Sequence, residues 1–147
     1  MATQETRVIS IAELAEWVHG LVPSPLIAIL FAGDRILCCD EAVAIQKDGK
    51  IVGVATIAPK GEGLSGVPTI VALYILPVYR RKGYGKKILE AAINRCIERG
   101  FPKIRVDVMS SYAMAIIDSL DKNLFDVVEV HNLGNVMDYF VHLEEER

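Results

Sequence analysis

Apolar side chains recur along this chain with two different spacings, and each spacing predicts a different kind of element. A spacing of three to four residues predicts helices over residues 11–20 and 86–99, and a serine cap predicts a third from residue 110 or 111 to 122. Alternating or unbroken apolar runs predict strands at residues 41–46, 51–58, 69–76, 104–108, 125–130 and 136–143. Residues 26–31 fit a short helix or a strand equally well. The order of these elements predicts a mixed α/β domain.

Several residues at the ends of these elements carry their own signal. Ser10 and Glu13 form a capping-box pattern at the start of the first helix. Asp48-Gly49, between the first two strands, is typical of a tight hairpin turn. Gly100 is expected to end the second helix, and Asn123 is expected to take the left-handed position that follows the third.

Composition and charge narrow the class of protein. A length of 147 residues suits one domain, 1–147, and the 52% of hydrophobic residues leaves a homodimer open. The net charge of -3 gives no general attraction to nucleic acid or to an anionic membrane. The apolar stretch at 25–32 is too short to span a bilayer. Three cysteines without a Cys-x-x-Cys motif, and no secretion signal, lead us to expect reduced thiols in the cytoplasm and no metal site.

The strongest chemical signal is the turn Arg80-Arg81-Lys82-Gly83-Tyr84-Gly85. It connects the strand over 69–76, which is apolar enough to be a central strand, to the helix over 86–99. Backbone N–H groups at a helix start attract an anion, and glycines let a phosphate come close to the backbone. A dinucleotide-binding motif fails because Ile88 stands where its third glycine is required. A P-loop fails because Lys87 stands where serine or threonine is required.

Arg80-x-x-Gly83-x-Gly85, with the preceding Pro77-Val78-Tyr79, resembles the acyl-CoA pyrophosphate loop of the GNAT N-acetyltransferase superfamily. Segments 48–53 and 135–140 are also similar to that family, so the resemblance covers residues 41–143. It implies a GNAT-type fold: a mixed, mostly antiparallel sheet, flanked by helices, whose strands ending at Leu76 and Met109 splay apart around the pantetheine arm. It also implies acetyl transfer from acetyl-CoA directly to a primary amine. The implied acetyl-CoA-binding residues are Tyr74, Ile75, Arg80, Arg81, Lys82, Gly83, Tyr84, Gly85 and Lys86, with free main-chain groups expected near Tyr74, Ile75 and Leu76.

The residues for proton transfer depart from the family pattern. Where the family often has Asn-x-x-Ala-x-x-x-Tyr, this chain keeps Ala115 but has Tyr112 in the Asn position and Ser119 in the Tyr position. By this resemblance Ser119 is the candidate proton donor, although a serine is a weaker acid than the family's tyrosine.

The general base is equally open, because residues 69–76 contain no carboxylate. Asp107 is the main candidate, with an ion pair to Arg105 as the alternative, and Glu62 and His131 are further candidates. A GNAT-like acyl-CoA-binding or regulatory module with weak or no catalysis is therefore the alternative function. The acceptor is open among a small amine, a peptide N-terminus and a lysine side chain.

Overall fold

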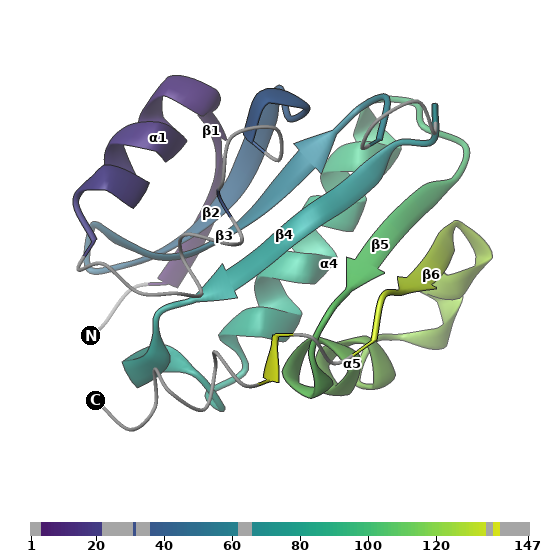
Figure 1. Cartoon of the computed structure of the whole chain (residues 1–147). Helices are drawn as coiled ribbons and strands as arrows, with labels where there is room; N and C mark the ends of the chain where they lie inside the picture. Colours follow the sequence, from purple (N-terminus) through teal and green to yellow (C-terminus); the bar gives the residue numbers. More distant parts are fainter. Residues whose placement is uncertain (1–3, 22–30, 32–35, 62–65, 135–136, 139–147) are drawn as a thin grey trace.

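A computed structural model describes residues 4–21, 31, 36–61, 66–134 and 137–138 of the chain (Figure 1). The sheet has six strands in the order β1-β2-β3-β4-β5-β6. They are β1 (Gln4–Ser10), β2 (Glu41–Lys47), β3 (Lys50–Ala58), β4 (Thr69–Ile75), β5 (Ile104–Val108) and β6 (Val128–Asn132). The helices are α1 (Ile11–His19), η1 (Pro77–Tyr79), α4 (Tyr84–Glu98), α5 (Ser111–Asp118) and η2 (Lys122–Asp126). None of the helices in the described ranges is long and apolar enough to cross a membrane.

The predicted helices are present, with corrected ends. Ser10 Oγ accepts a hydrogen bond from the Glu13 N–H at 3.1 Å, which confirms the cap of α1. Gly100 has φ +84° just after α4, as predicted. The prediction for Asn123 was wrong: α5 already ends at Asp118, and Asn123 lies in the short helix η2. There the Asn123 N–H donates to the carboxylate of Asp121 at 3.0 Å, so Asp121 caps the start of η2.

The predicted strands are also present where the structure describes the chain, except at two places. Asp48 and Gly49 have φ of 52° and 82°, the two positive values that a tight hairpin turn requires. β6 begins at Val128 rather than at residue 125 because η2 occupies the preceding segment. Of the range predicted at 136–143, only Met137 and Asp138 are described, and neither lies in a strand. The uncertain range 26–31 lies outside the described residues except for Phe31.

Strand β1 is an element that the sequence pattern did not reveal. It pairs antiparallel with β2 from Gln4↔Lys47 to Ser10↔Glu41, at the edge of the sheet. Only Ile9 among its residues is buried, so it lacks the apolar alternation by which strands are recognised. Its stability therefore comes from the ladder with β2 and not from its own burial.

Two helices cover opposite faces of the sheet and enclose the core (Figure 1). On one face α4 buries the apolar side chains that the sequence predicted: Ile88, Leu89, Ala92, Ile93 and Cys96. Burying one isoleucine or leucine side chain stabilises the fold by about 1.5–3 kcal/mol. On the other face Leu14 of α1 packs in a cluster with Tyr74 of β4. Strand β4 is thus covered on both sides, as predicted.

Ion pairs fix the carboxyl end of α4 to the start of β2. Arg95 Nε donates to the Glu41 carboxylate at 2.8 Å, and Arg99 donates to Asp40 at 2.7 Å and to Glu41 at 3.1 Å. These contacts raise the pKa of both guanidinium groups, chiefly through the hydrogen bonds to their carboxylate partners. These ion pairs hold the carboxyl end of α4 in place. The amino end of α4 therefore has a fixed position beside the end of β4.

The splayed pair of central strands is confirmed. Strands β4 and β5 are parallel, but they pair only at Thr69↔Arg105 and Ile70↔Val106, near the beginning of each strand. Beyond these two pairs the strands diverge toward their carboxyl ends (Figure 1). By contrast, β5 and β6 stay in register over five residues. The sheet thus opens in its middle, next to the turn that leads into α4.

Candidate functional site

The residues 80–85, which we call the phosphate turn, lead into α4 and include its first two residues. Gly83 is the cap residue and has φ 84°, while Arg81 has φ 62°. The first helical bond runs from the Lys87 N–H to the Gly83 carbonyl at 3.2 Å. The N–H groups of the first helical turn have no acceptor within the helix, and they point at the space in front of the turn. A Cβ on Gly83 would meet no atom within 4 Å, so this face of the turn is open.

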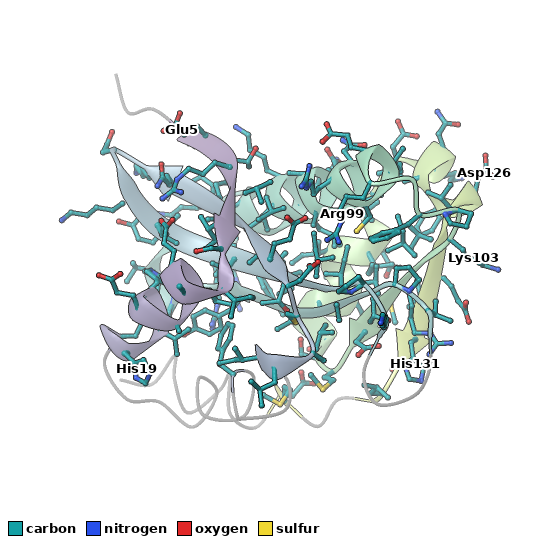
Figure 2. All side chains as sticks on the ribbon, turned by 90° about the horizontal axis from the view of Figure 1, so that it is seen from above. Glu5, His19, Arg99, Lys103, Asp126 and His131 are labelled. Atoms are coloured by element: carbon teal, nitrogen blue, oxygen red, sulfur yellow. The ribbon has the colours of Figure 1, made fainter. Side chains whose placement is uncertain are left out.

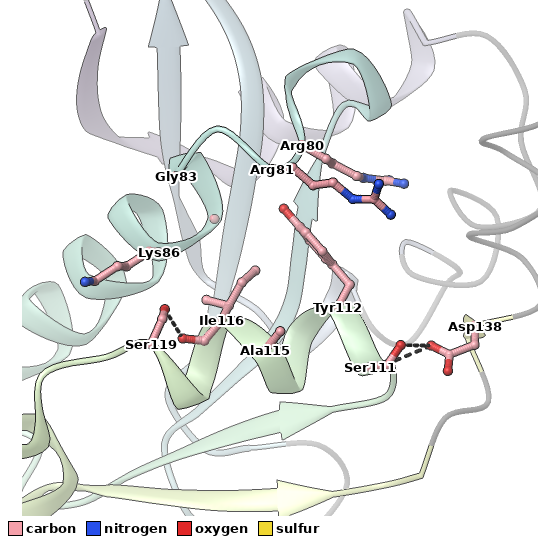
Figure 3. A pocket seen from close by; sticks show the side chains of 11 residues that line it. Arg80, Arg81, Gly83, Lys86, Ser111, Tyr112, Ala115, Ile116, Ser119 and Asp138 are labelled. Carbon is pink, nitrogen blue, oxygen red and sulfur yellow. Dashed lines mark hydrogen bonds between the residues drawn. The ribbon is translucent and has the colours of Figure 1, made fainter.

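The open face forms one wall of a cavity of about 670 Å³, which we call the turn cavity. Its other wall is α5 (Figure 3). The described residues that line it are Arg80, Arg81, Gly83, Gly85, Lys86, Ser111, Tyr112, Ala115, Ile116, Ser119 and Asp138. Arg81 and Lys86 are exposed, and Figure 3 shows the Lys86 side chain directed away from Tyr112. Lys82 is also exposed, with Nζ 6.0 Å from the Tyr79 ring. Positive charge and a helix start therefore border a space that can hold an anion.

The two arginines of the phosphate turn have different environments. Arg80 is only 8% exposed, and its Nε donates to the Ile75 carbonyl at 2.8 Å. Its guanidinium carbon lies 5.2 Å from the Tyr74 ring centre and 5.7 Å from the Tyr112 ring centre. Arg80 thus fixes the end of β4, whereas the neighbouring Arg81 is in contact with solvent. The sequence did not distinguish the two residues.

A second and smaller cavity, of about 40 Å³, lies between the splayed strands, and we call it the gap cavity. It is lined by Val71, Leu73, Tyr74, Ile75, Arg80, Asp107, Met109, Ser110, Tyr112, Ala113 and Met137. Arg80 and Tyr112 line both cavities, so these two side chains stand between them.

The main chain at the end of β4 corrects one expectation. The Leu76 N–H donates to the Val52 carbonyl at 2.9 Å, so it faces β3 and is not free for a ligand. Because successive residues of a strand face opposite edges, the main chain of Tyr74 faces β3 as well, and that of Ile75 faces the gap. The contact of Arg80 with the Ile75 carbonyl agrees with this assignment.

Two residues of the predicted site serve the packing of α4. The Tyr84 side chain is 4% exposed, and its hydroxyl accepts a hydrogen bond from Gln4 Nε2 at 3.1 Å. A Cβ on Gly85 would lie 2.5 Å from Ile116 Cδ1 and 3.1 Å from the Tyr112 hydroxyl. The second glycine of the turn is therefore required by the close contact between α4 and α5.

We expect Gly85→Leu to destabilise the fold by about 1–3 kcal/mol, because a larger side chain must push α5 away from α4. Chemical denaturation with urea measures this change. The matched control is the same substitution in an Ile116→Ala background, where the space is available. The cost of Gly85→Leu should fall in that background; equal costs in the two backgrounds would contradict the assigned contact.

Ser119, the predicted proton donor, lies at the carboxyl end of α5. Its hydroxyl donates to the Ile116 carbonyl at 2.6 Å (Figure 3). Ser119 lines the turn cavity, but it is not among the described residues that line the gap cavity. Tyr112, seven residues earlier and so about 10 Å away along the helix axis, lines both. Burial raises the pKa of the Tyr112 hydroxyl, and the charge of Arg80 partly offsets this effect. Tyr112 therefore keeps its proton at neutral pH.

Asp107 has a partner that the sequence did not predict. Its carboxylate Oδ1 lies 3.0 Å from Nδ1 of His131, in the facing position of β6. The expected ion pair with Arg105 is wrong, since Arg105 lies 3.8 Å from Glu129 instead. His131 lies on strand β6. Reading β5 and β6 as neighbours would have predicted the pair, but their adjacency is not visible in the sequence. Glu62 lies outside the described residues.

Comparisons with solved structures agree with this fold. An aminoglycoside acetyltransferase from an uncultured soil metagenomic sample, in complex with sisomicin, is 17% identical with a TM-score of 0.55, over 82% of this chain and 88% of that one. Ribosomal-protein-alanine N-acetyltransferase from Brucella melitensis biovar Abortus 2308 is 16% identical with a TM-score of 0.52, over 81% and 92%. A protein from Clostridium acetobutylicum described as a predicted acetyltransferase, solved with acetyl-CoA, is 18% identical with a TM-score of 0.53, over 79% and 87%.

The likeness to these structures shows a shared fold. A search of curated protein sequences gives no match. The sequence pattern of the acetyltransferase (GNAT) family, however, matches residues 12–117. This match covers more than half of the chain, and the chain therefore belongs to the acetyltransferase (GNAT) family.

Proposed function

We propose that this protein is an N-acetyltransferase that moves an acetyl group from acetyl-CoA directly to a primary amine. The observation that carries the proposal is the open start of α4 beside the turn cavity, which adjoins the gap cavity of the splayed strands at Arg80 and Tyr112. An anionic group can bind at the helix start while a narrow arm reaches the gap. Membership of the acetyltransferase (GNAT) family supports this reading.

In this proposal the pyrophosphate of acetyl-CoA binds the phosphate turn. The N–H groups at Tyr84, Gly85 and Lys86 face it at the start of α4, and the open φ 84° conformation of Gly83 lets it approach. Arg81, Lys82 and Lys86 supply positive charge from solvent-exposed positions. A helix start contributes about 0.3–1 kcal/mol per charge, and a charge-assisted hydrogen bond about 1.5–3 kcal/mol. The main chain of Ile75, which faces the gap, is the proposed partner of the pantetheine arm.

The chemistry that fits this arrangement is direct transfer. The neutral amine nitrogen attacks the thioester carbonyl carbon and the C–S bond breaks. The nitrogen of the new amide loses a proton, and the CoA thiolate takes one up. We propose Asp107 as the acceptor of the proton that the ammonium must lose, because its carboxylate lines the gap cavity. Tyr112 is our proposed donor to the thiolate, since it lines the gap and keeps its proton at neutral pH. Ser119 is the second candidate donor, at the far end of the turn cavity.

Two measurements test the function. Isothermal titration with acetyl-CoA tests the donor, and no binding at millimolar acetyl-CoA overturns the proposal. Release of the CoA thiol is then measured with alkylamines, a peptide with an N-terminal alanine, a lysine peptide and an aminoglycoside. The aminoglycoside and the alanine peptide are included because two of the similar structures are described as an aminoglycoside acetyltransferase and a ribosomal-protein-alanine N-acetyltransferase. Binding without thiol release on any acceptor favours the alternative function, an acyl-CoA-binding or regulatory module.

A further inference from the structure

Strand β1 leaves one edge of the sheet open in the part of the chain that the structure describes. It is the first strand in the order β1-β2-β3-β4-β5-β6, so its inner side pairs with β2 and its outer side has no strand beside it among the described residues. The strand is seven residues long, contains no proline and pairs with β2 in continuous register. Its outer side therefore presents a row of backbone N–H and C=O groups, to which a further strand can bind.

Helix α1 follows β1 directly, but it packs over the middle of the sheet. Leu14 shares a buried cluster with Val54 of β3, and Trp17 Nε1 donates to the Ile51 carbonyl of the same strand at 3.2 Å. All residues of β1 except one are exposed, and Figure 2 shows Glu5 at the outer rim of the molecule. The outer side of β1 is therefore accessible to a partner.

The exposed side chains of β1 carry both signs of charge on one face. The odd-numbered residues, among them Glu5 and Arg7, lie on the face that α1 covers, because Ile9 belongs to the buried cluster beneath α1. The even-numbered residues lie on the face that α4 covers, because Gln4 donates to the Tyr84 hydroxyl of α4 at 3.1 Å. One face of the edge strand thus has a carboxylate and a guanidinium two residues apart.

These charges select one register for a second copy of the strand. In an antiparallel pair, opposite side chains lie on the same face, and a two-fold axis places one residue opposite itself. With the axis at Thr6, Glu5 of each copy lies opposite Arg7 of the other. With the axis at Glu5 two carboxylates meet, and with the axis at Arg7 two guanidinium groups meet. The charges of β1 therefore favour the axis at Thr6.

The other face of β1 agrees with the same register. Val8 is 42% exposed, and with Val43 and Ala91 it lines a groove of about 290 Å³ beside α4. With the axis at Thr6, Gln4 of the second copy lies opposite Val8, where its methylene groups remove apolar surface from water. An exposed valine is thereby covered by the same pairing that matches the charges.

Arg7 has the capacity for a second carboxylate. Its Nη1 donates to Glu13 of its own chain at 3.1 Å, and the Arg7 side chain remains 41% exposed. A guanidinium group has five N–H donors, so it can bind two carboxylates at once. The contact of Arg7 with Glu13 therefore holds the side chain in place without using all of its donors.

We propose that this protein forms a homodimer in which the β1 strands of two copies pair antiparallel about a two-fold axis at Thr6. The pairing joins the two sheets into one and closes the open edge of each. Its specificity comes from the two Glu5–Arg7 pairs, and its main-chain hydrogen bonds come from the outer side of β1. The homodimer does not depend on the proposed function, since none of its contacts involves acetyl-CoA or an acceptor.

The first test reverses the charges one at a time and then mixes the variants. In Glu5→Arg and in Arg7→Glu, two pairs of opposite charge become two pairs of like charge. The dissociation constant of the dimer, measured by sedimentation equilibrium, should therefore rise about 30-fold in each variant alone. In an equimolar mixture the new arginine of one variant lies opposite the new glutamate of the other. The mixture should dimerise with a dissociation constant within about threefold of the wild-type value.

A disulfide cross-link tests the register itself. In Thr6→Cys the two new thiols lie opposite each other, with Cβ atoms about 4.5–5.5 Å apart, which is close to the separation that a disulfide needs. The matched control is Gln4→Cys, whose two thiols are four residues apart along the strands, or about 13 Å. Mild oxidation should give covalent dimers of Thr6→Cys on a non-reducing gel, and Gln4→Cys should give no more than the wild type.

Several results would overturn the homodimer. One is a wild-type protein that stays monomeric at millimolar concentration. Another is a mixture of the two charge variants that associates no better than each variant alone, or a dissociation constant that neither variant changes. Equal cross-linking of Thr6→Cys and Gln4→Cys, or none in Thr6→Cys, also contradicts it. Circular dichroism checks that each variant is folded, and if Arg7→Glu does not fold, the cross-link decides.

Discussion

Gly83→Glu is expected to abolish the binding of acetyl-CoA while the protein stays folded. The new carboxylate stands at the helix start, where the pyrophosphate is proposed to bind, and repels it. Gly83 has φ 84°, and a side chain in this conformation costs about 1–2 kcal/mol, which a domain of this size tolerates. Titration calorimetry should show at least a 100-fold loss of affinity, equivalent to about 2.8 kcal/mol.

The matched control is Gly83→Asn. Asparagine tolerates the left-handed conformation, carries no charge, and meets no atom within 4 Å at its Cβ. We expect it to keep most of the affinity. A loss as large as that of Gly83→Glu would mean that the shape of the turn, and not the charge, is what the substitution removes. Unchanged affinity in Gly83→Glu would refute the assigned site.

Arg80 and Arg81 are expected to give opposite results when each is replaced. Arg80→Met removes the donor to the Ile75 carbonyl and the contacts with two tyrosine rings, at a position that is 8% exposed. A hydrogen bond from a charged group is worth about 1.5–3 kcal/mol, so we expect a loss of about 2 kcal/mol in the free energy of unfolding. For a chain of this size that loss lowers Tm by about 4–8 °C.

Arg81→Asn should leave Tm unchanged, because the side chain is exposed and asparagine tolerates the φ of 62°. The variant should bind acetyl-CoA with about tenfold lower affinity, since one positive charge near the pyrophosphate is lost. The difference from the wild type should shrink at high salt, where exposed charges are screened. Thermal melts and calorimetry on the two variants decide the assignment. If Arg81→Asn lowers Tm and Arg80→Met does not, the roles given to the two residues are reversed.

Local signals in the sequence predicted those parts of the fold that depend on local chemistry. Ser10, Asp48-Gly49 and Gly100 each act through their immediate neighbours, and all three predictions are confirmed. The phosphate turn belongs to the same class, because a strand end, a glycine and a helix start follow one another in the chain. The left-handed conformation of Gly83 is the feature that such a turn requires.

Features that depend on contacts between distant segments escaped the sequence. Gly85 was predicted as a phosphate contact, and the structure adds a second role, because its small size is needed by Ile116 of α5. Asp107 looked like a partner of Arg105 because the two share a strand, whereas its contact is His131 on the next strand. Strand β1 has no apolar pattern in its sequence, and it is held in the sheet by its backbone hydrogen bonds to β2. In each case the deciding neighbour lies many residues away along the chain.

The junction between β4 and β5 divides the sheet into two bodies. Strands β1 to β4 are joined by antiparallel ladders, and β5 with β6 forms a separate parallel ladder. Between β4 and β5 the described residues form two pairs. Such a seam is a natural place for sub-global opening, and amides on its two sides should exchange hydrogen with separate protection. A donor held by the start of α4 on one side and by α5 on the other would bridge the seam. Its binding would then slow hydrogen exchange at the amides of β5 and β6, because the bound donor would connect the two parts of the sheet.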